Sequence, residues 1–160
     1  MFIPIEKSKD KTENYKIMLE HLEHFLYQGD TFITTLSNLS AYLKYFLADI
    51  NWVGFYLYDG EKLTLGPFQG LPACTEIKLG VGVCGSSAEK RVTTIVKDVH
   101  SFPGHIACDS NSSSEIVVPI LNKNTLIGVL DIDSPIKDRF DKIDQLYLEK
   151  VIDKLVDIIG

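Results

Sequence analysis

The spacing of the apolar residues divides this chain into helical ends and a strand-rich middle. Over residues 11–28, and again over residues 30–47, apolar side chains recur every three or four positions, which is typical of helices with one buried face. From Trp52 onward the repeat shortens to two residues, as in strands. The helical spacing returns only over residues 141–159. We therefore expect two helices, a sheet and a closing helix.

Capping and turn residues mark the boundaries between these elements. Gly29 is expected to end the first helix and Asp30 to cap the second. Asp59-Gly60 and Asn122-Lys123-Asn124 are typical of hairpin turns. A short helix is expected over residues 86–91. Strand composition is found over residues 52–58, 62–65, 76–79, 93–96, 115–121 and 125–133.

Strands joined by hairpins, with helices at the two ends, favour an antiparallel sheet and an α+β fold over a doubly wound one. The helices are expected to cover one face of the sheet, which leaves the other face for a ligand pocket. The 160-residue chain suits a single domain, residues 1–160, with a core large enough to need no disulfide or metal. The long loop over residues 97–114 is a candidate lid.

Composition and charge exclude several classes of partner. The chain has 16 basic and 22 acidic residues, a formal net charge of −6, and no run of Lys or Arg that would follow a phosphate backbone. No segment reaches the ~18 apolar residues of a membrane span, and the N-terminus does not have the pattern of a signal peptide. We expect a cytoplasmic protein that binds neither nucleic acid nor membranes. In that reducing compartment its three cysteines favour redox or nucleophilic chemistry, with unreactive buried cysteines as the alternative.

Two of the expected strands carry an acidic and an aromatic face. Asp131 and Asp133 share one face of their strand, because residues two apart point the same way. Trp52 and Tyr56 likewise share a face of the first strand, opposite an apolar set. Aromatic walls with two carboxylates suit a small ligand that carries an ammonium group. A solvated sheet face for the acids, and simple packing for the aromatics, remain open alternatives.

The cysteines are not spaced as zinc ligands. Cys84 follows Cys74 by ten residues and precedes Cys108 by 24, so there is no C-x-x-C pair. A site formed by His100, His105 and Cys108 has no obvious fourth ligand, and we expect no metal. Cys84 precedes the short expected helix, where free backbone N–H groups and the helix dipole favour a thiolate. Cys84 is therefore a candidate reactive thiol.

The glycines at positions 80, 82 and 85 formally match the dinucleotide-binding pattern G-x-G-x-x-G. That pattern functions between a buried parallel strand and a full helix, neither of which is expected here. We therefore expect no nucleotide cofactor, and no cofactor of another kind.

Much of the chain from Asn51 to Pro135 resembles the free methionine-R-sulfoxide reductases, single GAF domains that act as enzymes. The resemblance is specific because several motifs, with all three cysteines, come in the same order. They are Asn51-Trp52-Val53-Gly54-Phe55-Tyr56, Leu65-Gly66-Pro67-Phe68-Gln69-Gly70, Pro72-Ala73-Cys74, Gly82-Val83-Cys84-Gly85, Phe102-Pro103-Gly104-His105-Ile106-Ala107-Cys108-Asp109, Ser114-Glu115-Ile116-Val117-Val118-Pro119 and Leu130-Asp131-Ile132-Asp133-Ser134-Pro135.

The resemblance implies reduction of the R epimer of free methionine sulfoxide, with thioredoxin as the source of electrons and a homodimeric assembly. It implies that Cys108 attacks the sulfoxide sulfur and becomes a sulfenic acid. Cys84 or Cys74 then forms a disulfide with it, which a dithiol partner reduces. Cys84 also keeps its own claim to the attacking role, from its place at the start of a helix. Glu115, on the strand after the Cys108 loop, is the candidate that protonates the sulfoxide oxygen.

The same resemblance assigns the substrate contacts. Asp131 and Asp133 would bind the ammonium group, and Trp52 and Tyr56 would enclose the methyl end. A methionine sulfoxide residue inside a polypeptide has no free ammonium, so this arrangement selects the free amino acid. Backbone N–H groups of residues 110–113 would bind the substrate carboxylate. The alternatives are a GAF module that binds a small ligand without catalysis, and a thiol-based redox sensor.

Overall fold

The computed structural model of the chain describes residues 2–105 and 108–160. Ile106 and Ala107, which belong to one of the motifs above and to the expected lid over residues 97–114, lie outside the described residues.

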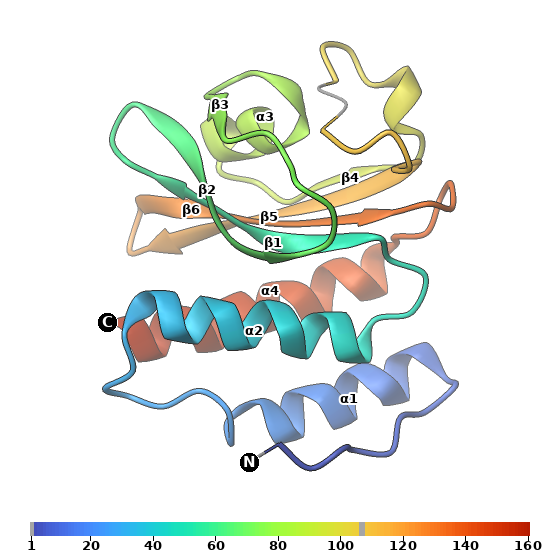
Figure 1. The fold of residues 1–160 in the computed structure, drawn as a ribbon, viewed down its shortest axis with the longest axis vertical. Coiled ribbons are helices and arrows are strands. Elements are labelled where there is room, and N and C mark those ends of the chain that lie inside the picture. The colour runs from blue at the N-terminus through green and yellow to red at the C-terminus, as the bar shows by residue number, and fades with distance from the viewer. Residues whose placement is uncertain (1, 106–107) are drawn as a thin grey trace.

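An antiparallel sheet forms the middle layer of the molecule (Figure 1). Across the described residues its strands are ordered β3-β2-β1-β6-β5-β4, and each neighbouring pair is antiparallel. This confirms the α+β class. The strands are β1 Trp52–Tyr58, β2 Lys62–Gln69, β3 Glu76–Lys78, β4 Thr94–Val96, β5 Ser114–Asn122 and β6 Thr125–Ser134.

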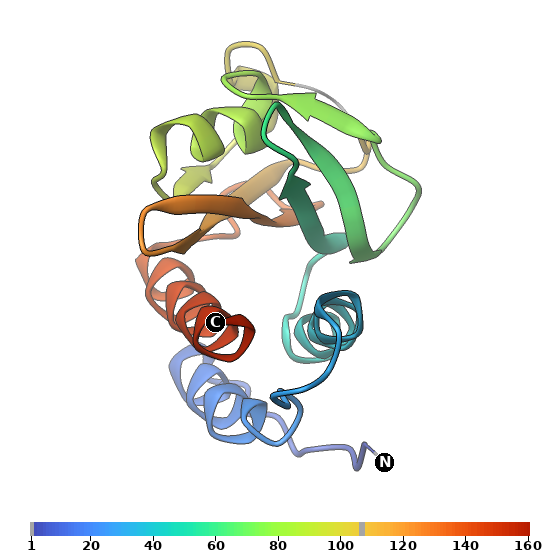
Figure 2. The same ribbon diagram turned by 90° about the vertical axis from the view of Figure 1, so that its left-hand side faces the viewer.

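Helices from the two ends of the chain cover one face of this sheet. α2 (Phe32–Phe46) and α4 (Lys142–Ile159) lie against the strands, and α1 (Lys11–Leu22) packs beneath them (Figures 1 and 2). α3 (Gly82–Lys90) lies on the opposite face. None of the helices in residues 2–105 and 108–160 combines the length and apolar composition that a membrane span requires.

The alternation of side chains along β1 and β6 separates two apolar cores. Phe55 and Ile132 are buried on the helix-covered side of the sheet. Tyr56 and Val129 belong to the smaller cluster on the α3 side. The two-residue repeat therefore predicted correctly which strand residues face the helices.

The end of the first helix and the cap of the second differ from those predicted. α1 ends at Leu22 and not near Gln28. Leu26, just after the turn over residues 23–25, is still buried in the core, so the apolar spacing continues beyond the helix. The cap of α2 is Thr31 and not Asp30, since the Thr31 hydroxyl accepts a hydrogen bond from the Thr34 backbone N–H at 3.2 Å.

The strand predicted to stop at Leu65 continues through Gly66-Pro67 to Gln69. Its pairing with β1 shifts register between Gly54 and Tyr56, so a bulge accommodates the proline, which cannot donate a ladder hydrogen bond. This extension brings Phe68 beside Gly54, where an added Cβ would lie 2.3 Å from the Phe68 Cβ. Glycine is therefore required there by close packing of the two strands.

A buried carboxylate joins α1 to α4. Asp144 has no exposed side-chain surface, and its Oδ1 accepts hydrogen bonds from Tyr15 Oη at 2.7 Å and Arg139 Nη1 at 3.2 Å. Its Oδ2 pairs with Lys11 Nζ and accepts the backbone N–H of Asp141 at 2.8 Å, which completes a capping box at the start of α4.

Replacing Asp144 by alanine is expected to lower the free energy of unfolding by about 3–5 kcal/mol, because two cations and a tyrosine hydroxyl lose a buried partner. Urea denaturation followed by circular dichroism measures this. Asp153→Ala is the matched control, since Asp153 is exposed on the same helix and its loss is expected to change stability by less than about 0.5 kcal/mol. A loss below about 1 kcal/mol for Asp144→Ala would show that the network is not stabilising.

Candidate active site

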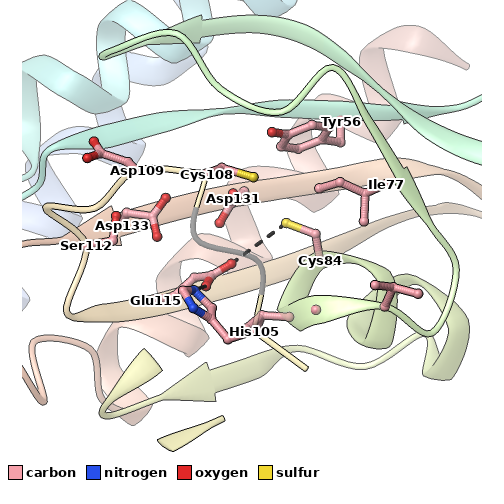
Figure 3. A pocket seen from close by; sticks show the side chains of 13 residues that line it. Tyr56, Ile77, Cys84, His105, Cys108, Asp109, Ser112, Glu115, Asp131 and Asp133 are labelled. Atoms are coloured by element: carbon pink, nitrogen blue, oxygen red, sulfur yellow. Dashed lines mark hydrogen bonds and ion pairs between the residues drawn. The ribbon is translucent and has the colours of Figure 1, made fainter. Parts of the chain in front are cut away.

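A pocket lies on the face of the sheet that the terminal helices leave free, the face on which α3 also lies. Residues of β1, β5 and β6 form its floor, and residues of α3 together with His105, Cys108, Asp109 and Ser112 form its walls (Figure 3). The expectation of a pocket on this face is therefore met. Its lining residues are Tyr56, Ile77, Val81, Gly82, Val83, Cys84, His105, Cys108, Asp109, Ser112, Glu115, Asp131 and Asp133.

Three carboxyl groups from neighbouring strands converge in this pocket. In the ladder between β5 and β6, Glu115 is paired with Asp133, and Asp131 lies two residues before Asp133 in β6. Glu115 and Asp131 are each only 6% exposed. The strand alternation thus placed Asp131 and Asp133 on one face correctly, and that face forms part of the pocket floor and not a solvated surface (Figure 3).

Burial of these acids in a common pocket disfavours their charged forms. Burial raises the pKa of Glu115 well above its ordinary value, and the nearby Asp131 and Asp133 raise it further. The pKa of Asp131 is raised to about 6, again by burial. Asp131 Oδ1 has no hydrogen-bond partner within the described residues. A pocket with these properties favours a ligand that brings positive charge to the carboxylates.

Cys84 lies inside α3 and not before it, because this helix begins at Gly82, four residues earlier than predicted. Its Sγ lies 3.8 Å from Glu115 Oε1. Burial raises the pKa of the Cys84 thiol well above its ordinary value, and the charges of Asp131 and Glu115 add to this. Cys84 thus lies in the first turn of α3, close to the helix terminus as predicted, but its burial and the three nearby carboxyl groups disfavour the thiolate that this position was expected to favour.

The other two cysteines form a disulfide. Cys74, between β2 and β3, is bonded to Cys108, with their Cα atoms 5.4 Å apart. Cys84 is a free, buried thiol. Of the two pairings left open for Cys108, the structure has the one with Cys74. Cys108 lines the pocket, whereas Cys74 is only partly buried, so the disulfide joins the pocket wall to the segment between β2 and β3.

The two aromatic residues predicted to form the site have different positions. Tyr56 lines the pocket, and its hydroxyl donates a hydrogen bond to the Cys74 carbonyl at 3.0 Å. Trp52 is not among the lining residues. Its ring stacks on those of Tyr56 and Phe68, with distances between ring centroids of 5.9 Å and 5.2 Å. Its indole N–H donates to the Leu71 carbonyl at 3.1 Å. Both side chains therefore also hold the segment that carries Cys74.

Several side chains that line the pocket were not among the predicted catalytic or substrate-binding side chains. His105 Nε2 lies 3.9 Å from Glu115 Oε2, whereas His100, considered beside it as a metal ligand, is exposed and does not line the pocket. Asp109 and Ser112 also line the pocket. The side-chain amide of Asn51 donates hydrogen bonds to Asp109 Oδ2 at 2.9 Å and to Ser112 Oγ at 3.2 Å. The motifs around Asn51 and His105 were visible in the sequence, but nothing in it indicated that they lie together.

The curled sheet, its terminal helices and the pocket opposite them define a GAF domain, and the family model described as "GAF domain" matches residues 30–156. The chain is 44% identical to the free methionine-R-sulfoxide reductase of Escherichia coli over 151 residues, which is 94% of this chain and 92% of that protein. It is 46% identical to Protein YtsP of Bacillus subtilis over 157 residues, 97% of this chain and 96% of that one.

Solved structures give the same result. The free methionine-R-sulfoxide reductase of Neisseria meningitidis, solved in complex with its substrate, superposes with a TM-score of 0.94 at 41% sequence identity, over 98% of this chain and 95% of that one. The chain belongs to the GAF-domain family of free methionine-R-sulfoxide reductases.

Proposed function

We propose that this protein reduces the R epimer of free methionine sulfoxide to methionine by cysteine chemistry. The observation that carries the proposal is the position of Cys108, which lines a pocket of buried carboxyl groups and is bonded to a second cysteine. The oxidised product of the reaction would be this disulfide. The family relationship supports the same activity.

The proposed reaction has three steps. The Cys108 sulfur attacks the sulfoxide sulfur while Glu115 gives a proton to the sulfoxide oxygen. The resulting hydroxyl group is then transferred to the Cys108 sulfur as the bond between the two sulfurs breaks, so methionine is released and Cys108 becomes a sulfenic acid. The Cys74 thiol then attacks the sulfenic sulfur, and the disulfide forms as water leaves. A dithiol such as thioredoxin reduces the disulfide and is itself oxidised.

Substrate recognition would use the charge of the pocket. Asp131 and Asp133 would bind the ammonium group, which compensates two carboxylates in a poorly solvated site. Tyr56, supported by the stacked Trp52, would contact the methyl end. Backbone N–H groups of residues 110–113 would bind the substrate carboxylate. A thioredoxin partner and a homodimer, both implied by the resemblance, belong to this proposal.

The experiment is an incubation of the reduced protein with racemic free methionine sulfoxide and dithiothreitol. About half of the substrate is expected to be converted, since only the R epimer reacts, and a peptide containing methionine sulfoxide is expected to remain unchanged. Chiral chromatography of the residual sulfoxide measures this. Conversion of neither epimer would contradict the proposal.

A thiol-based redox sensor is the second candidate, because a reversible Cys74–Cys108 disulfide would serve it equally well. The same incubation separates the two. A sensor would oxidise once, without repeated turnover of the sulfoxide, and a module that only binds a ligand would leave both epimers and its own cysteines unchanged.

A further inference from the structure

The thiol that the proposed reaction leaves unused lies in a compact group of three potential metal ligands. The Cys84 sulfur, a Glu115 carboxylate oxygen and an Asp131 carboxylate oxygen lie within 4.8 Å of one another, and all three residues are buried. They come from α3, β5 and β6, so the tertiary structure brings them together (Figure 3).

A second observation shows that this group is incomplete without a ligand. Asp131 Oδ1 is buried and has no hydrogen-bond partner among the described residues, in a side chain that faces the pocket. No lysine or arginine is among the described residues that line the pocket. A buried carboxylate oxygen without a donor or cation is costly, so the site favours a positively charged ligand.

We propose that Cys84, Glu115 and Asp131 form a binding site for a thiophilic divalent cation of the zinc class. Tetrahedral zinc, with bonds of about 2.0–2.3 Å to oxygen and sulfur, places its ligand atoms about 3.3–3.8 Å apart. The distance from Cys84 Sγ to Glu115 Oε1 is already 3.8 Å. The Asp131 oxygen lies within 4.8 Å of the other two ligand atoms, so it would have to move inward only slightly to reach the tetrahedral spacing.

His105 supplies a candidate fourth ligand. Its Nε2 lies 3.9 Å from the other Glu115 oxygen, on the same side of the pocket (Figure 3). A set of one sulfur, two carboxylates and one imidazole favours zinc or cadmium over magnesium or calcium, which prefer oxygen ligands alone. A thiolate and two carboxylates carry three negative charges, which a divalent cation largely compensates.

The proposed ion would share Asp131 with the ammonium group of the substrate. On the proposed function, zinc and methionine sulfoxide therefore exclude one another, and zinc inhibits the reductase reversibly and competitively. The ion would also cover the Cys84 sulfur.

The disulfide form of the protein gives the sharpest test, because Cys84 is then its only thiol. Without any substrate, this form is expected to bind one Zn²⁺ per chain in a calorimetric titration. Cd²⁺ is expected to give the ultraviolet charge-transfer absorption of a cadmium–thiolate bond. Mg²⁺ is expected to give no binding.

Cys84→Ser and Asp131→Asn are each expected to weaken Zn²⁺ binding by at least about 10–100-fold, and Cys84→Ser is expected to lose the cadmium absorption. Glu61→Gln removes an exposed acid outside the pocket, and this variant is expected to bind Zn²⁺ with the same affinity as the wild-type protein. Circular dichroism establishes that each variant folds. As a second readout, Zn²⁺ is expected to raise the melting temperature of the unchanged protein and not that of Cys84→Ser.

Unaltered Zn²⁺ affinity in Cys84→Ser, equal binding of Mg²⁺, or no Zn²⁺ binding to the folded unchanged protein would each overturn the metal site. These measurements need no sulfoxide, so they are independent of the proposed activity. If the protein bound zinc but did not turn over the sulfoxide, only the proposed function would be contradicted. If it bound zinc but its turnover were not inhibited by Zn²⁺, only the inference that the ion and the substrate share Asp131 would be contradicted.

Discussion

Replacing Cys108 by serine is expected to abolish reduction of free methionine (R)-sulfoxide, with either dithiothreitol or thioredoxin as the reductant. A serine hydroxyl cannot accept the sulfoxide oxygen as a sulfenic acid, so the first step has no substitute and the rate should fall by about three orders of magnitude or more. Chromatographic measurement of the methionine released, at saturating sulfoxide, tests this. Cys108 lines the pocket, and so the change removes the reacting atom.

Cys74→Ser is the matched variant, since it removes the other half of the same disulfide. It is expected to keep turnover with dithiothreitol, because a small thiol reduces the sulfenic acid directly, and to lose turnover with thioredoxin. If Cys108→Ser remained active while Cys84→Ser were inactive, the assignment of the attacking cysteine would be reversed.

Asp133→Asn is expected to raise KM for the sulfoxide by about 10–100-fold, which corresponds to losing a charged hydrogen bond worth about 1.5–3 kcal/mol. Folding should be little affected. Burial raises the pKa of Asp133, and Asp131 raises it further, so the charge of Asp133 is disfavoured in the folded protein and a neutral side chain of similar shape is tolerated. Initial rates over a range of sulfoxide concentrations and urea denaturation of the same samples measure the two effects.

Asp157→Asn makes the same change of charge at an exposed position of α4, and it should leave KM unchanged. The comparison therefore separates a local contact from the effect of net charge. An unchanged KM in Asp133→Asn would remove Asp133 from the ammonium site. A large loss of stability would instead give the residue a structural role.

Local patterns predicted those parts of the fold that depend on neighbouring residues. The two-residue repeat placed Asp131 and Asp133 on one face of β6, and the helical repeats placed α2 and α4 on the other side of the sheet. Boundaries were less accurate where tertiary packing overrode the pattern. Leu26 is buried from outside a helix, and β2 continues through Pro67 because a bulge in β2 accommodates the proline.

The chemistry of the cysteines could not be predicted locally. From sequence, Cys84 had the features of an activated thiol at a helix terminus. Its buried position beside Glu115, which disfavours the thiolate, depends on a strand 31 residues later in the chain. The choice of Cys74 as the partner of Cys108 likewise depends on a contact across 34 residues.

The sequence by itself determined the fold class, the face on which the pocket lies and the family, because periodicity and ordered motifs are properties of the chain alone. Only the tertiary structure decided which groups meet: that Cys84 lies against Glu115 and Asp131, that Cys74 and not Cys84 is bonded to Cys108, and that Trp52 supports the pocket from outside its lining. The physical reason is that burial, and the charges of residues distant in sequence, set the properties of a thiol or a carboxyl group. Neither this burial nor the proximity of these charges exists until the strands have paired and α3 has packed against them.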